Sequence, residues 1–420
     1  MRNYRILTML IAPLLPLWLF IRRLRGKEDR LRFRERFGIA SQPRPPGTLL
    51  WLHAASVGEA NSVLPFIFKM RAHYPHINLL LTTGTVTSAA LMQKRLPKDV
   101  IHQYAPIDTP KATDRFIWHW RPDFAFWVES EFWPNLIWTA NDFGSFMGVI
   151  NARMSERSFA SWQKRPAMIH DMLSCFNLVF AQSEQDGARL KTLGAKHMSC
   201  CGNIKYDAAT LPCNEDELIA FKNTIGNRPL WLAASTHPGE ELLIAEAHKL
   251  LSATRKNLLT IIVPRHPARG SSIATELQTF GKIALRSKQE SITTDTKFYI
   301  ADTLGELGLF YRASDIVFMG GSLVNHGGQN PLEPAKLSCA VLTGPHTHNF
   351  SDIYAEMEKA GVVIRVQNAA GLAAQIDKLL NDAKAREAMQ NAVRFWMQDK
   401  GGATDRLLEN LQPIFEVRQP

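Results

Sequence analysis

The feature that most constrains the fold of this chain is an alternation of short apolar runs with amphipathic segments. The first series of apolar runs covers residues 49–54, 78–84, 124–130, 146–152 and 178–183. Stretches with helical spacing of apolar residues, such as NSVLPFIFKMRAHY after the first run, follow several of these runs. Short buried strands that alternate with helices are typical of βαβ units, so the pattern predicts a parallel sheet covered by helices.

The alternation lapses between residues 206 and 228 and then resumes. The second series covers residues 230–235, 258–264, 297–302, 315–321, 339–344 and 362–366. A chain of 420 residues is long enough for two ordinary domains. We therefore predict two Rossmann-like α/β domains, at 41–205 and at 229–420 with the C-terminal helices, joined by a linker at 206–228.

The first forty residues differ in character from these domains. Positions 6–21 are sixteen nearly all apolar residues without a charge. As a helix this run would be about 24 Å long, shorter than the roughly 30 Å of a bilayer core, and Pro13 and Pro16 would kink it. Arg22, Arg23 and Arg25 follow it, where a cleaved signal peptide would carry small residues. We predict a membrane anchor that either spans the bilayer or lies in its interface, with these arginines on the cytoplasmic side.

The net charge of +10 is concentrated in the same segment. Ten Lys or Arg residues stand against three acidic ones in residues 1–40, which leaves only +3 for the remaining 380 positions. A nucleic-acid-binding domain carries basic residues across one face of its body, so the distribution argues against a nucleic-acid partner. Residues 30–37 interleave arginines with Leu31, Phe33 and Phe37, which suits an anionic lipid surface.

Ligands of open parallel sheets bind beyond the carboxyl ends of the strands, so the residues after each run are the site candidates. The first run ends in His53 and is followed by Ser56 and Glu59. The spacing of Ser56 and Glu59 is that of a helix capping box, so Glu59 either only satisfies backbone donors or acts as a general base. A helix N-terminus would lower the pKa of this carboxylate and weaken it as a base.

Two further candidates follow later runs of the first domain. Glu129 and Glu131 stand two residues apart after the apolar stretch FAFWV. They either face one site together or form the acidic start of the helix that begins near Trp133. Lys205 lies where the linker begins, and it is either a solvated surface residue or a charge placed at the domain junction.

The second domain carries candidates for an anionic ligand. Arg265 follows Pro264 at the end of a run, where arginine suits bidentate phosphate binding. The segments 303–306 and 326–334 each lead into a helix, and the second follows the glycines at 320 and 321. Glycine-rich loops and helix N-termini hold phosphates, so these motifs favour a nucleotide site. GxGxxG, GxxxxGK and GxSxG motifs are absent, which argues against dinucleotide, P-loop and α/β-hydrolase sites. His346 and His348 lack matching ligands nearby, so we expect no metal site there.

Together these motifs resemble the 3-deoxy-D-manno-octulosonic acid (Kdo) transferases. The resemblance covers essentially the whole chain, including the N-terminal anchor and the arginine-rich segment after it. Its motifs, in order, are HAASVGE, ESEFWPN, NARMS, AQSEQDGARL, LGAK, GNIKYD, STHPGEE, PRHP, DTLGELG, GGSLVNHGGQNPLEP and GPHTHNF. The family often has Ser-Val where Ala54-Ala55 stand here, a change that leaves Ser56 and Glu59 in place.

The resemblance implies a GT-B glycosyltransferase fold, two Rossmann-like domains with the active site in a cleft between them. It implies an inverting transfer of Kdo from CMP-Kdo to the lipid A precursor (lipid IVA) at the cytoplasmic face of the inner membrane, without a cofactor or a catalytic metal. It makes Glu59 the base and assigns transition-state support to Glu129 and Lys205. It maps the CMP contacts onto Pro264, Arg265, Leu304, Gly305, Glu306, Asn330, Pro331, Leu332 and Glu333.

Two other interpretations stay open at this point. One is a membrane-associated GT-B enzyme that uses a different nucleotide-sugar. The other is a non-catalytic binding protein, tethered to the membrane and built on a transferase fold. The joint presence of Glu59, Glu129 and Lys205 argues against the second interpretation.

Overall fold

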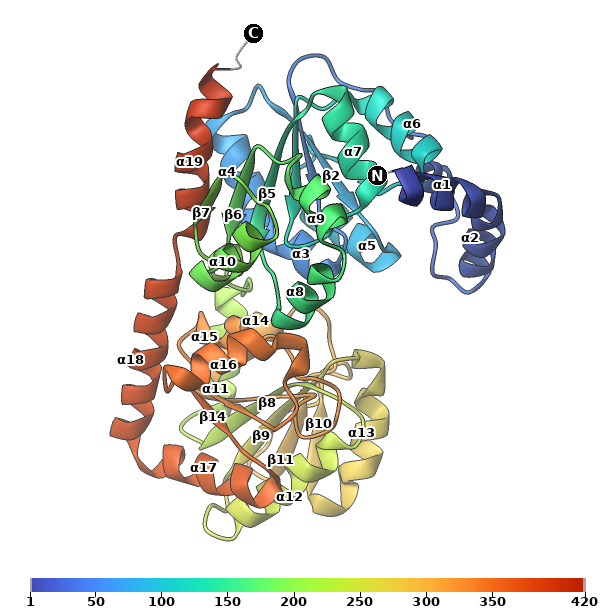
Figure 1. Cartoon of the computed structure of the whole chain (residues 1–420). Coiled ribbons are helices and arrows are strands. Elements are labelled where there is room, and N and C mark those ends of the chain that lie inside the picture. Colours follow the sequence, from blue (N-terminus) through green and yellow to red (C-terminus); the bar gives the residue numbers. More distant parts are fainter. Residues whose placement is uncertain (1, 418–420) are drawn as a thin grey trace. The chain divides into compact units, whose positions relative to one another are not determined.

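The computed structural model describes residues 2–417 and divides into two compact units. The first unit extends to Ala208 and resumes at Lys400, and the second unit is Ala209–Asp399. Each unit contains its own seven-stranded parallel sheet (Figure 1). The predicted class, two Rossmann-like α/β domains, is confirmed.

In the first unit the strand order is β3-β2-β1-β4-β5-β6-β7. The strands are β1 (Leu49–His53), β2 (Asn78–Thr83), β3 (Ile101–Tyr104), β4 (Phe124–Val128), β5 (Phe146–Ala152), β6 (Leu178–Ala181) and β7 (Met198–Cys200). The helices between them are α3 (Val57–Ser62), α4 (Leu64–His73), α5 (Val86–Arg95), α6 (Pro110–Trp120), α7 (Pro134–Phe143), α8 (Glu156–Gln163), α9 (Pro166–Leu173) and α10 (Glu184–Thr192), and the 3₁₀ turn η3 (Ile204–Asp207) follows β7.

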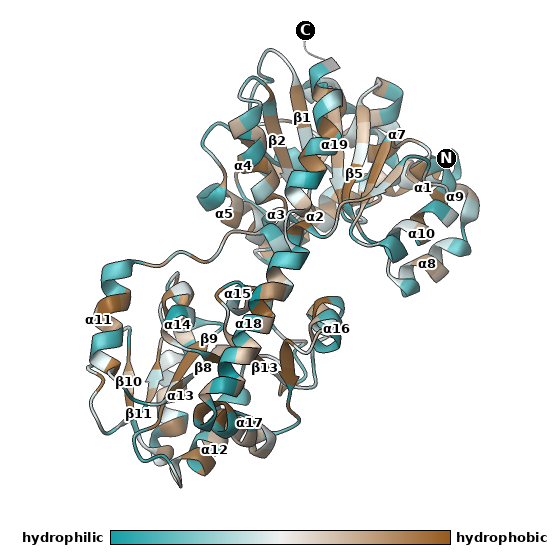
Figure 2. Ribbon diagram, turned by 90° about the vertical axis from the view of Figure 1, so that its left-hand side faces the viewer, coloured by the Kyte–Doolittle hydropathy of each residue, from teal (hydrophilic) through white to brown (hydrophobic). Residues whose placement is uncertain are grey.

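The central strands of this sheet are buried on both faces, which explains why they read as continuous apolar runs. Leu50 and Leu52 of β1 pack into one hydrophobic cluster, whereas Leu49 and Trp51 pack into the cluster on the opposite face. The alternation follows from the two-residue period of a strand. Figure 2 shows the strands as the most hydrophobic parts of the ribbon.

The chain returns to the first unit at its end. Helix α19 (Ala403–Val417) packs beside α4 and η3, and its Phe415 ring lies 5.0 Å from that of Phe124 in β4. Asp207 accepts hydrogen bonds from the amides of Gly402 and Thr404 and so caps this helix. The sequence prediction placed all C-terminal helices in the second domain, but α19 belongs to the first because its apolar stripe completes the core beneath β4.

The N-terminal segment is helical and lies against α6 of the first unit. Helices α1 (Arg2–Ile11) and α2 (Leu15–Leu24) are separated by one 3₁₀ turn, η1 (Ala12–Leu14), where Pro13 lies. By length and composition the stretch from Arg2 to Leu24 is apolar enough to cross a membrane, and very little of it is buried.

Part of the segment predicted to be a basic interfacial strip is instead folded into the body. In the 3₁₀ turn η2 (Phe33–Phe37) both Glu35 and Arg36 are buried. Glu35 accepts a hydrogen bond from the backbone of Tyr104, and Arg36 donates to the carbonyl of Ala105, so this turn is bonded to β3 and the residue after it.

The second unit also has seven parallel strands, in the order β10-β11-β9-β8-β12-β13-β14. Compared with the first sheet, β11 is inserted between β9 and β10, and the opposite side has one strand fewer. The strands are β8 (Leu230–Thr236), β9 (Leu259–Pro264), β10 (Lys282–Leu285), β11 (Thr296–Ile300), β12 (Ile316–Met319), β13 (Ala340–Thr343) and β14 (Val363–Arg365). The helices are α11 (Glu215–Ile225), α12 (Glu240–Ser252), α13 (Gly270–Leu277), α14 (Leu307–Ala313), α15 (Leu332–Ala335), α16 (Ser351–Lys359), α17 (Ala369–Asn381) and α18 (Ala383–Lys400), with 3₁₀ turns η4 (Pro267–Arg269), η5 (Gln278–Phe280) and η6 (His348–Phe350).

The stretch predicted as a linker, 206–228, contains structure that belongs to this second unit. Helix α11 packs through Phe221, whose ring lies 5.4 Å from that of Phe310 and 5.6 Å from that of Tyr299. The connection between the units is therefore shorter than predicted, and it passes through Ala208 and Ala209.

Candidate functional site

The strand order of the first unit reverses between β1 and β4, and such a switch point is where open α/β sheets bind ligands. Two of the predicted site segments leave the sheet at this place. Glu59 follows β1 at the start of α3, and Glu129 follows β4 directly. The topology thus brings together carboxylates that are 70 positions apart in the sequence.

Glu59 makes the contacts of a capping residue. Its Oε1 accepts a hydrogen bond from the Ser56 hydroxyl at 2.7 Å, and its Oε2 accepts one from the Ala55 amide at 2.8 Å. The Ser56 side chain in turn accepts a hydrogen bond from the Glu59 amide. These contacts confirm that Glu59 forms a capping box with Ser56, and they hold its carboxylate just after the end of β1.

The pKa of the Glu59 carboxyl is higher than a purely capping role would require. The pKa of its carboxyl is raised to about 7, first because the group is buried and then because the charges of Glu131 and Glu129 lie close to it. The hydrogen bonds from Ser56 and Ala55 act in the opposite direction. The expected lowering by the helix N-terminus is thus outweighed by desolvation. A carboxyl group that titrates near neutral pH is suited to general base catalysis.

Glu129 and Lys205 form an ion pair in this region. The amide of Ile204 donates a hydrogen bond of 3.0 Å to the side chain of Asn151 at the end of β5, which holds the turn η3 that carries Lys205. Glu129 has a φ of 61°, in the left-handed region that side chains other than glycine rarely adopt. Such backbone strain costs about 1–3 kcal/mol and is concentrated at functional sites.

An aromatic group borders the carboxylates. The Trp133 indole N–H donates a hydrogen bond of 3.0 Å to Glu131, and its ring lies 5.0 Å from that of His53. His53 is fully buried, and burial lowers its pKa to about 3, so its ring is neutral. The sequence prediction gave His53 no role and left that of Glu131 open, although both stand in motifs that it singled out.

The second unit has its own switch point, between β8 and β12. The glycine-rich loop after β12 was predicted to cradle a phosphate. Its amides are taken by a buried carboxylate instead: Glu240 accepts hydrogen bonds from Gly321, Ser322 and Leu323 at 2.6, 3.0 and 2.9 Å. This part of the prediction is wrong, because the chain supplies its own anion to the loop.

Glycine is required where these two segments meet. A Cβ on Gly320 would lie 2.6 Å from the carbonyl oxygen of Ser235, at the end of β8. The absence of a side chain therefore permits the close approach that lets Glu240 reach the loop.

Cationic and imidazole groups gather beside this buried carboxylate. The ring of His237 stacks on that of His326 at 3.6 Å, lies 6.2 Å from that of His266, and its Nε2 is 3.0 Å from the Gln329 amide nitrogen. The pKa of His237 is lowered to about 4, first by burial and then by His326, His266, Arg265 and Arg269. Several positive or protonatable groups thus surround one place, which suits a bound anion.

Arg265 and Arg269 differ in this cluster. Arg269 donates two hydrogen bonds, of 2.7 and 3.0 Å, to the buried Glu241. The side chain of Arg265 is exposed and pairs with no acidic group among the described residues. Arg265 is therefore the cation of this cluster that is free to bind a ligand.

The other residues predicted to contact CMP have varied environments. Pro264 and Leu332 are buried, so they can offer only their backbones. Glu306 accepts both hydrogen bonds of an ion pair with Arg286, and with Thr303 it lines a cavity of about 520 Å³. Gly305 has a φ of 89°, and Leu304 beside it is 85% exposed. Asn330 accepts from the amide of Leu332 and lies 3.4 Å from Glu333, and Pro331 stands between them.

Within residues 2–417 no three His, Cys, Asp or Glu side chains are grouped so that they could hold a metal ion. Metal-independence therefore stays a prediction from the family resemblance.

Sequence reasoning missed His237 and Glu240 in this unit, whereas His326 and Gln329 lie in the segment 326–334 that it singled out without giving either residue a role of its own. His237 and Glu240 stand just beyond the end of β8, at the switch point. Giving priority to the strand ends at the switch point would have found them. The stacking of His326 on His237 had no signal in the sequence.

Two family models match the chain. Residues 31–208 match the N-terminal model described as 3-deoxy-D-manno-octulosonic-acid transferase (kdotransferase), and residues 235–396 match the model of glycosyl transferases group 1. The chain is similar to a 3-deoxy-D-manno-octulosonic acid transferase of Haemophilus influenzae, with 36% identity over 98% of both chains. It is also similar to a probable mitochondrial enzyme of that name from Arabidopsis thaliana, with 37% identity over 93% of this chain and 90% of that one.

Solved structures agree with the fold. A putative UDP-N-acetylglucosamine 2-epimerase from Listeria monocytogenes aligns with a TM-score of 0.60 over 89% of this chain and 98% of its own. The identity is 15%, so this likeness concerns the fold alone.

Proposed function

The chain belongs to the Kdo transferase family of glycosyltransferases, and we propose that it moves Kdo from CMP-Kdo to the lipid A precursor, with Glu59 as the general base. Membership in the family makes the protein a glycosyltransferase of lipopolysaccharide biosynthesis. The identity of the acceptor as lipid IVA, the inversion at the anomeric carbon and the role of each residue are the proposal. Its main support is the Glu59 carboxyl, buried at the switch point with a pKa of about 7.

The proposed reaction is one displacement at the anomeric carbon of Kdo. A glucosamine hydroxyl of the acceptor attacks that carbon while its proton passes to Glu59, and the bond to the CMP phosphate breaks on the opposite face. General base catalysis of this kind contributes roughly 10²–10⁴-fold in rate. A base with a pKa near the working pH is deprotonated before the reaction and still accepts a proton during it.

We assign the Glu129–Lys205 ion pair to electrostatic stabilisation of negative charge rather than to proton transfer. Lys205 offers an ammonium group whose orientation is fixed by its bond with Glu129. An ammonium held in this way stabilises an anion without the reorganisation that a free side chain needs. We assign it to the negative charge of the donor, which carries both a phosphate and the Kdo carboxylate.

The donor nucleotide is assigned to the second unit. Arg265 supplies a guanidinium group that no acidic group engages among the described residues, next to the imidazoles of His237, His266 and His326. Guanidinium groups bind phosphate through two parallel hydrogen bonds. A comparison of CMP with UDP in a thermal-shift assay tests the nucleotide: a larger shift with UDP would favour the alternative of another nucleotide-sugar.

The variant Glu59→Gln tests the base. Gln keeps an oxygen that can accept the hydrogen bond from Ala55, so the fold should persist while the proton acceptor is lost. We expect transfer of Kdo from CMP-Kdo to lipid IVA, measured by mass spectrometry of the product in buffer with EDTA, to fall by at least about 10²-fold. CMP affinity should not change.

Asp186→Asn is the matched control for this variant. Asp186 has the same relation to a capping serine, since it bonds Ser183 at the start of α10. Its substitution removes a capping carboxylate without touching the group at the switch point. Near-normal turnover in Glu59→Gln, or an equal loss in both variants, would reduce Glu59 to a capping residue. Loss of wild-type activity in EDTA would contradict the proposed independence of metal.

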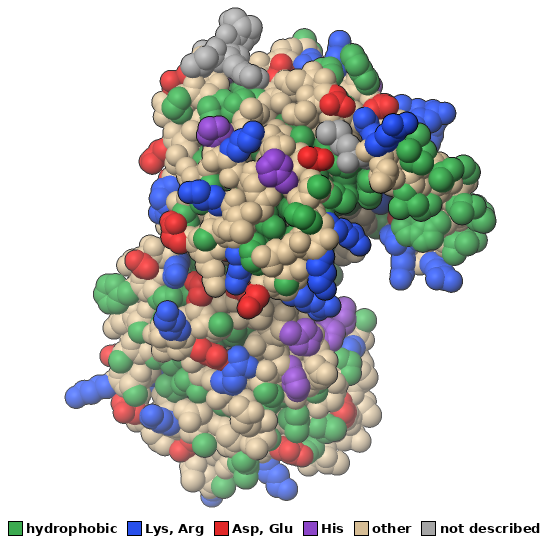
Figure 3. Space-filling model, viewed as in Figure 1, with side chains coloured by type: hydrophobic (Ala, Val, Ile, Leu, Met, Phe, Trp, Pro, Cys, Tyr) green, Lys and Arg blue, Asp and Glu red, His purple; other side chains and the backbone are tan. Residues whose placement is uncertain are grey.

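We also propose that residues 1–40 hold the enzyme at the cytoplasmic face of the inner membrane through anionic lipids. Leu14 and Leu17 are 65% and 62% exposed, and Figure 3 shows apolar side chains gathered over α1 and α2 with basic residues at their edge. Arg25, Lys27, Arg30 and Arg34 are exposed cations near this patch. These features match an amphipathic, positively charged membrane contact.

The double variant Leu14→Glu/Leu17→Glu tests the contact. Because both side chains are exposed, the folded state should be retained while sedimentation with anionic vesicles is lost. CMP binding should stay unchanged. Sedimentation equal to that of the wild type would show that another surface binds the membrane.

A further inference from the structure

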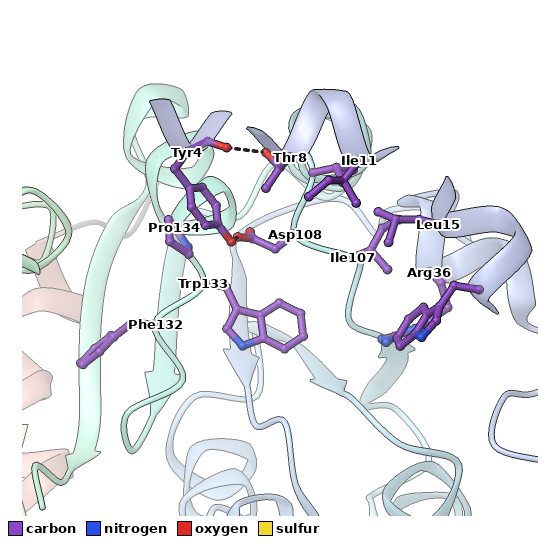
Figure 4. A pocket seen from close by; sticks show the side chains of 12 residues that line it. Tyr4, Thr8, Ile11, Leu15, Arg36, Ile107, Asp108, Phe132, Trp133 and Pro134 are labelled. Atoms are coloured by element: carbon purple, nitrogen blue, oxygen red, sulfur yellow. Dashed lines mark hydrogen bonds between the residues drawn. The ribbon is translucent and has the colours of Figure 1, made fainter. Parts of the chain in front are cut away.

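A cavity of about 430 Å³, open to the surface, lies between the N-terminal helices and the body of the first unit. Ile11 and Leu15 line it from the helices, and Ile107, Phe132, Trp133 and Pro134 line it from the body. Figure 4 shows the Trp133 indole beneath the open space, with Ile11 and Leu15 facing Ile107. The volume lies in the range of ligand pockets, roughly 300–1,000 Å³.

The main polar groups around the cavity are bonded to each other. The Tyr4 hydroxyl donates a hydrogen bond of 2.9 Å to Asp108, and that carboxylate also accepts bonds from the amides of Asn135 and Leu136. Thr8 accepts a hydrogen bond from the Asn135 side chain. Arg36 also lines the cavity, but its guanidinium donates a hydrogen bond to the carbonyl of Ala105 and pairs with Glu28. Because these polar groups have partners within the protein, the rest of the wall is mainly hydrocarbon and aromatic, and it favours an apolar ligand.

The same bonds fix the cavity in place. They connect α1 to the start of α7, so the helix that forms one wall is held against the body. The second wall is fixed by Leu19, which is fully buried and packs with Ile107 and Ala112. A pocket whose walls are held in this way is largely formed before a ligand arrives.

The surroundings of the cavity indicate a ligand that comes from a membrane. Leu10, Leu14 and Leu17 on the same helices are exposed, so the apolar patch continues from the cavity to the surface. Arg22, which pairs with Glu28, has its guanidinium 4.8 Å from the ring of Trp18, which lines the cavity. Arg25 and Lys27, just after it, are exposed cations. Apolar surface followed by cations matches a lipid that has acyl chains and an anionic head.

The cavity shares Trp133 with the proposed catalytic region. Its wall Phe132–Pro134 comes directly after Glu129–Glu131 in the chain. Trp133 lines the cavity and also donates its indole hydrogen bond to Glu131, whose charge helps to raise the pKa of Glu59. A chain bound in the cavity would therefore place the attached head group on the side of the carboxylates.

We propose that this cavity receives one acyl chain of the lipid acceptor and thereby positions the acceptor sugar at Glu59. The inference rests on the proposed function, since it takes the acceptor to be an acylated glucosamine lipid. It assigns Ile11, Leu15 and Ile107 to acceptor specificity rather than to the anchoring of the protein, for which the exposed residues of the same helices suffice.

Filling the cavity tests the proposal. Leu15→Trp adds a large side chain inside it, and Leu250→Trp adds the same side chain at an exposed position of α12, far from the N-terminal helices in the chain, as the control. With lipid IVA and CMP-Kdo, we expect Leu15→Trp to raise KM for the acceptor about tenfold, a change of about 1.4 kcal/mol in binding. KM for CMP-Kdo and membrane sedimentation should not change, and Leu250→Trp should behave as the wild type.

A deacylated acceptor separates the cavity from other effects. With it, Leu15→Trp and wild type should have the same kcat/KM, because no acyl chain is left to exclude. An equal effect on both acceptors, or equal behaviour of Leu15→Trp and Leu250→Trp, would overturn the proposal. Ile11→Trp, at a position 42% exposed, repeats the test should Leu15→Trp fail to fold.

Photolabelling distinguishes the acceptor from bulk lipid without relying on turnover. A lipid IVA analogue with a diazirine in an acyl chain should label the peptides that contain Ile107 and Phe132–Pro134. A phosphatidylethanolamine with the same diazirine should label only exposed residues of α1 and α2. Equal labelling of the inner peptides by both lipids would overturn the assignment to the acceptor. If the wild type labels as expected but transfers no Kdo, the proposed function fails and the cavity assignment stands.

Discussion

The two units place a buried glutamate at the same topological position and use it in different ways. Glu59 and Glu240 each follow the first strand of their sheet and open the next helix, and burial raises the pKa of both. Glu240 is fully buried and accepts four backbone hydrogen bonds, from His237 and from three residues of the loop after β12. Glu59 accepts one backbone bond and one from a hydroxyl, and it lies near two other carboxylates.

The difference separates a carboxylate whose acceptor positions are all used from one that keeps some of them free. The bonds to Glu240 use every acceptor direction of its oxygens, so it has no capacity left for a ligand. Glu59 keeps unused lone pairs on its carboxylate oxygens, and its 7% exposure leaves it within reach of a substrate. The comparison shows that burial alone does not mark a catalytic group, and that the count of satisfied hydrogen bonds is the better indicator.

Removal of Glu240 should have the largest effect. Glu240→Ala leaves four buried amides without an acceptor, and each unsatisfied donor costs about 1–3 kcal/mol, so we expect a loss of at least about 3 kcal/mol in the second unit. Hydrogen exchange measured by mass spectrometry should rise over 316–323 in particular. Unchanged protection there would mean that the loop holds its shape without the carboxylate.

Substitution of Arg265 should have the next largest effect, and it tests where the second unit binds its anion. Since Glu240 occupies the amides of Gly321, Ser322 and Leu323, these amides cannot hold a phosphate, and the proposed donor site relies more on side chains such as Arg265. We expect Arg265→Ala to weaken CMP by about ten- to a hundredfold, the loss of a charged hydrogen bond of about 1.5–3 kcal/mol, in calorimetric titration. The control Arg255→Ala removes a cation that pairs with Asp377. Equal weakening by both would indicate a general effect of charge.

The smallest expected effect is a shift in the pH dependence of kcat/KM for the acceptor. Glu59 must be ionised to accept a proton, so kcat/KM for the acceptor should fall as the pH drops below about 7. Glu131→Gln removes a neighbouring charge that raises this pKa, and it should move the acidic limb to lower pH. Ser56→Ala removes a bond that lowers the pKa, and it should move the limb to higher pH, each by up to about one unit. Limbs that do not move would assign the titration to another group.

The same pKa has a consequence for stability. A carboxyl whose pKa rises from its usual 4.5 to about 7 on folding favours the folded state at pH below 4.5 relative to pH above 7. Stability from this group is therefore lost as the pH rises through 7. The variant Glu59→Gln should unfold at a higher temperature than the wild type at pH 8 and at a similar temperature at pH 4.

Much of the first unit's site could be found from the sequence because its residues follow buried strands. Glu59, Glu129 and Lys205 stand directly after apolar runs or at the first break in the alternation, and periodicity locates such places. Their ion pair and the raised pKa could not be found in this way. Both depend on the order β1-β4 in the sheet and on the bend at Asn151 that brings η3 to the end of β4.

The ligand site of the second unit was harder to predict, because the sequence of its glycine-rich loop does not reveal whether an internal carboxylate occupies its amides. Nothing in the sequence GGSLVNHGGQNPLEP indicates that Glu240, some eighty positions earlier, occupies its amides. The helix α19 was misplaced for a similar reason. The apolar stripe of an amphipathic helix predicts that it will pack against a hydrophobic core, but only the tertiary packing decides which core.

The sequence by itself determined the two parallel sheets, the apolar N-terminal helix and the strand ends at which the site residues stand. These are local properties, since the pattern of neighbouring residues determines apolar periodicity and the order of the elements along the chain. Only the tertiary structure decided which carboxylate kept free acceptor positions, which amides were occupied and which sheet α19 completed. Those outcomes depend on hydrogen bonds and desolvation between residues that are far apart in the chain, and no local pattern encodes them.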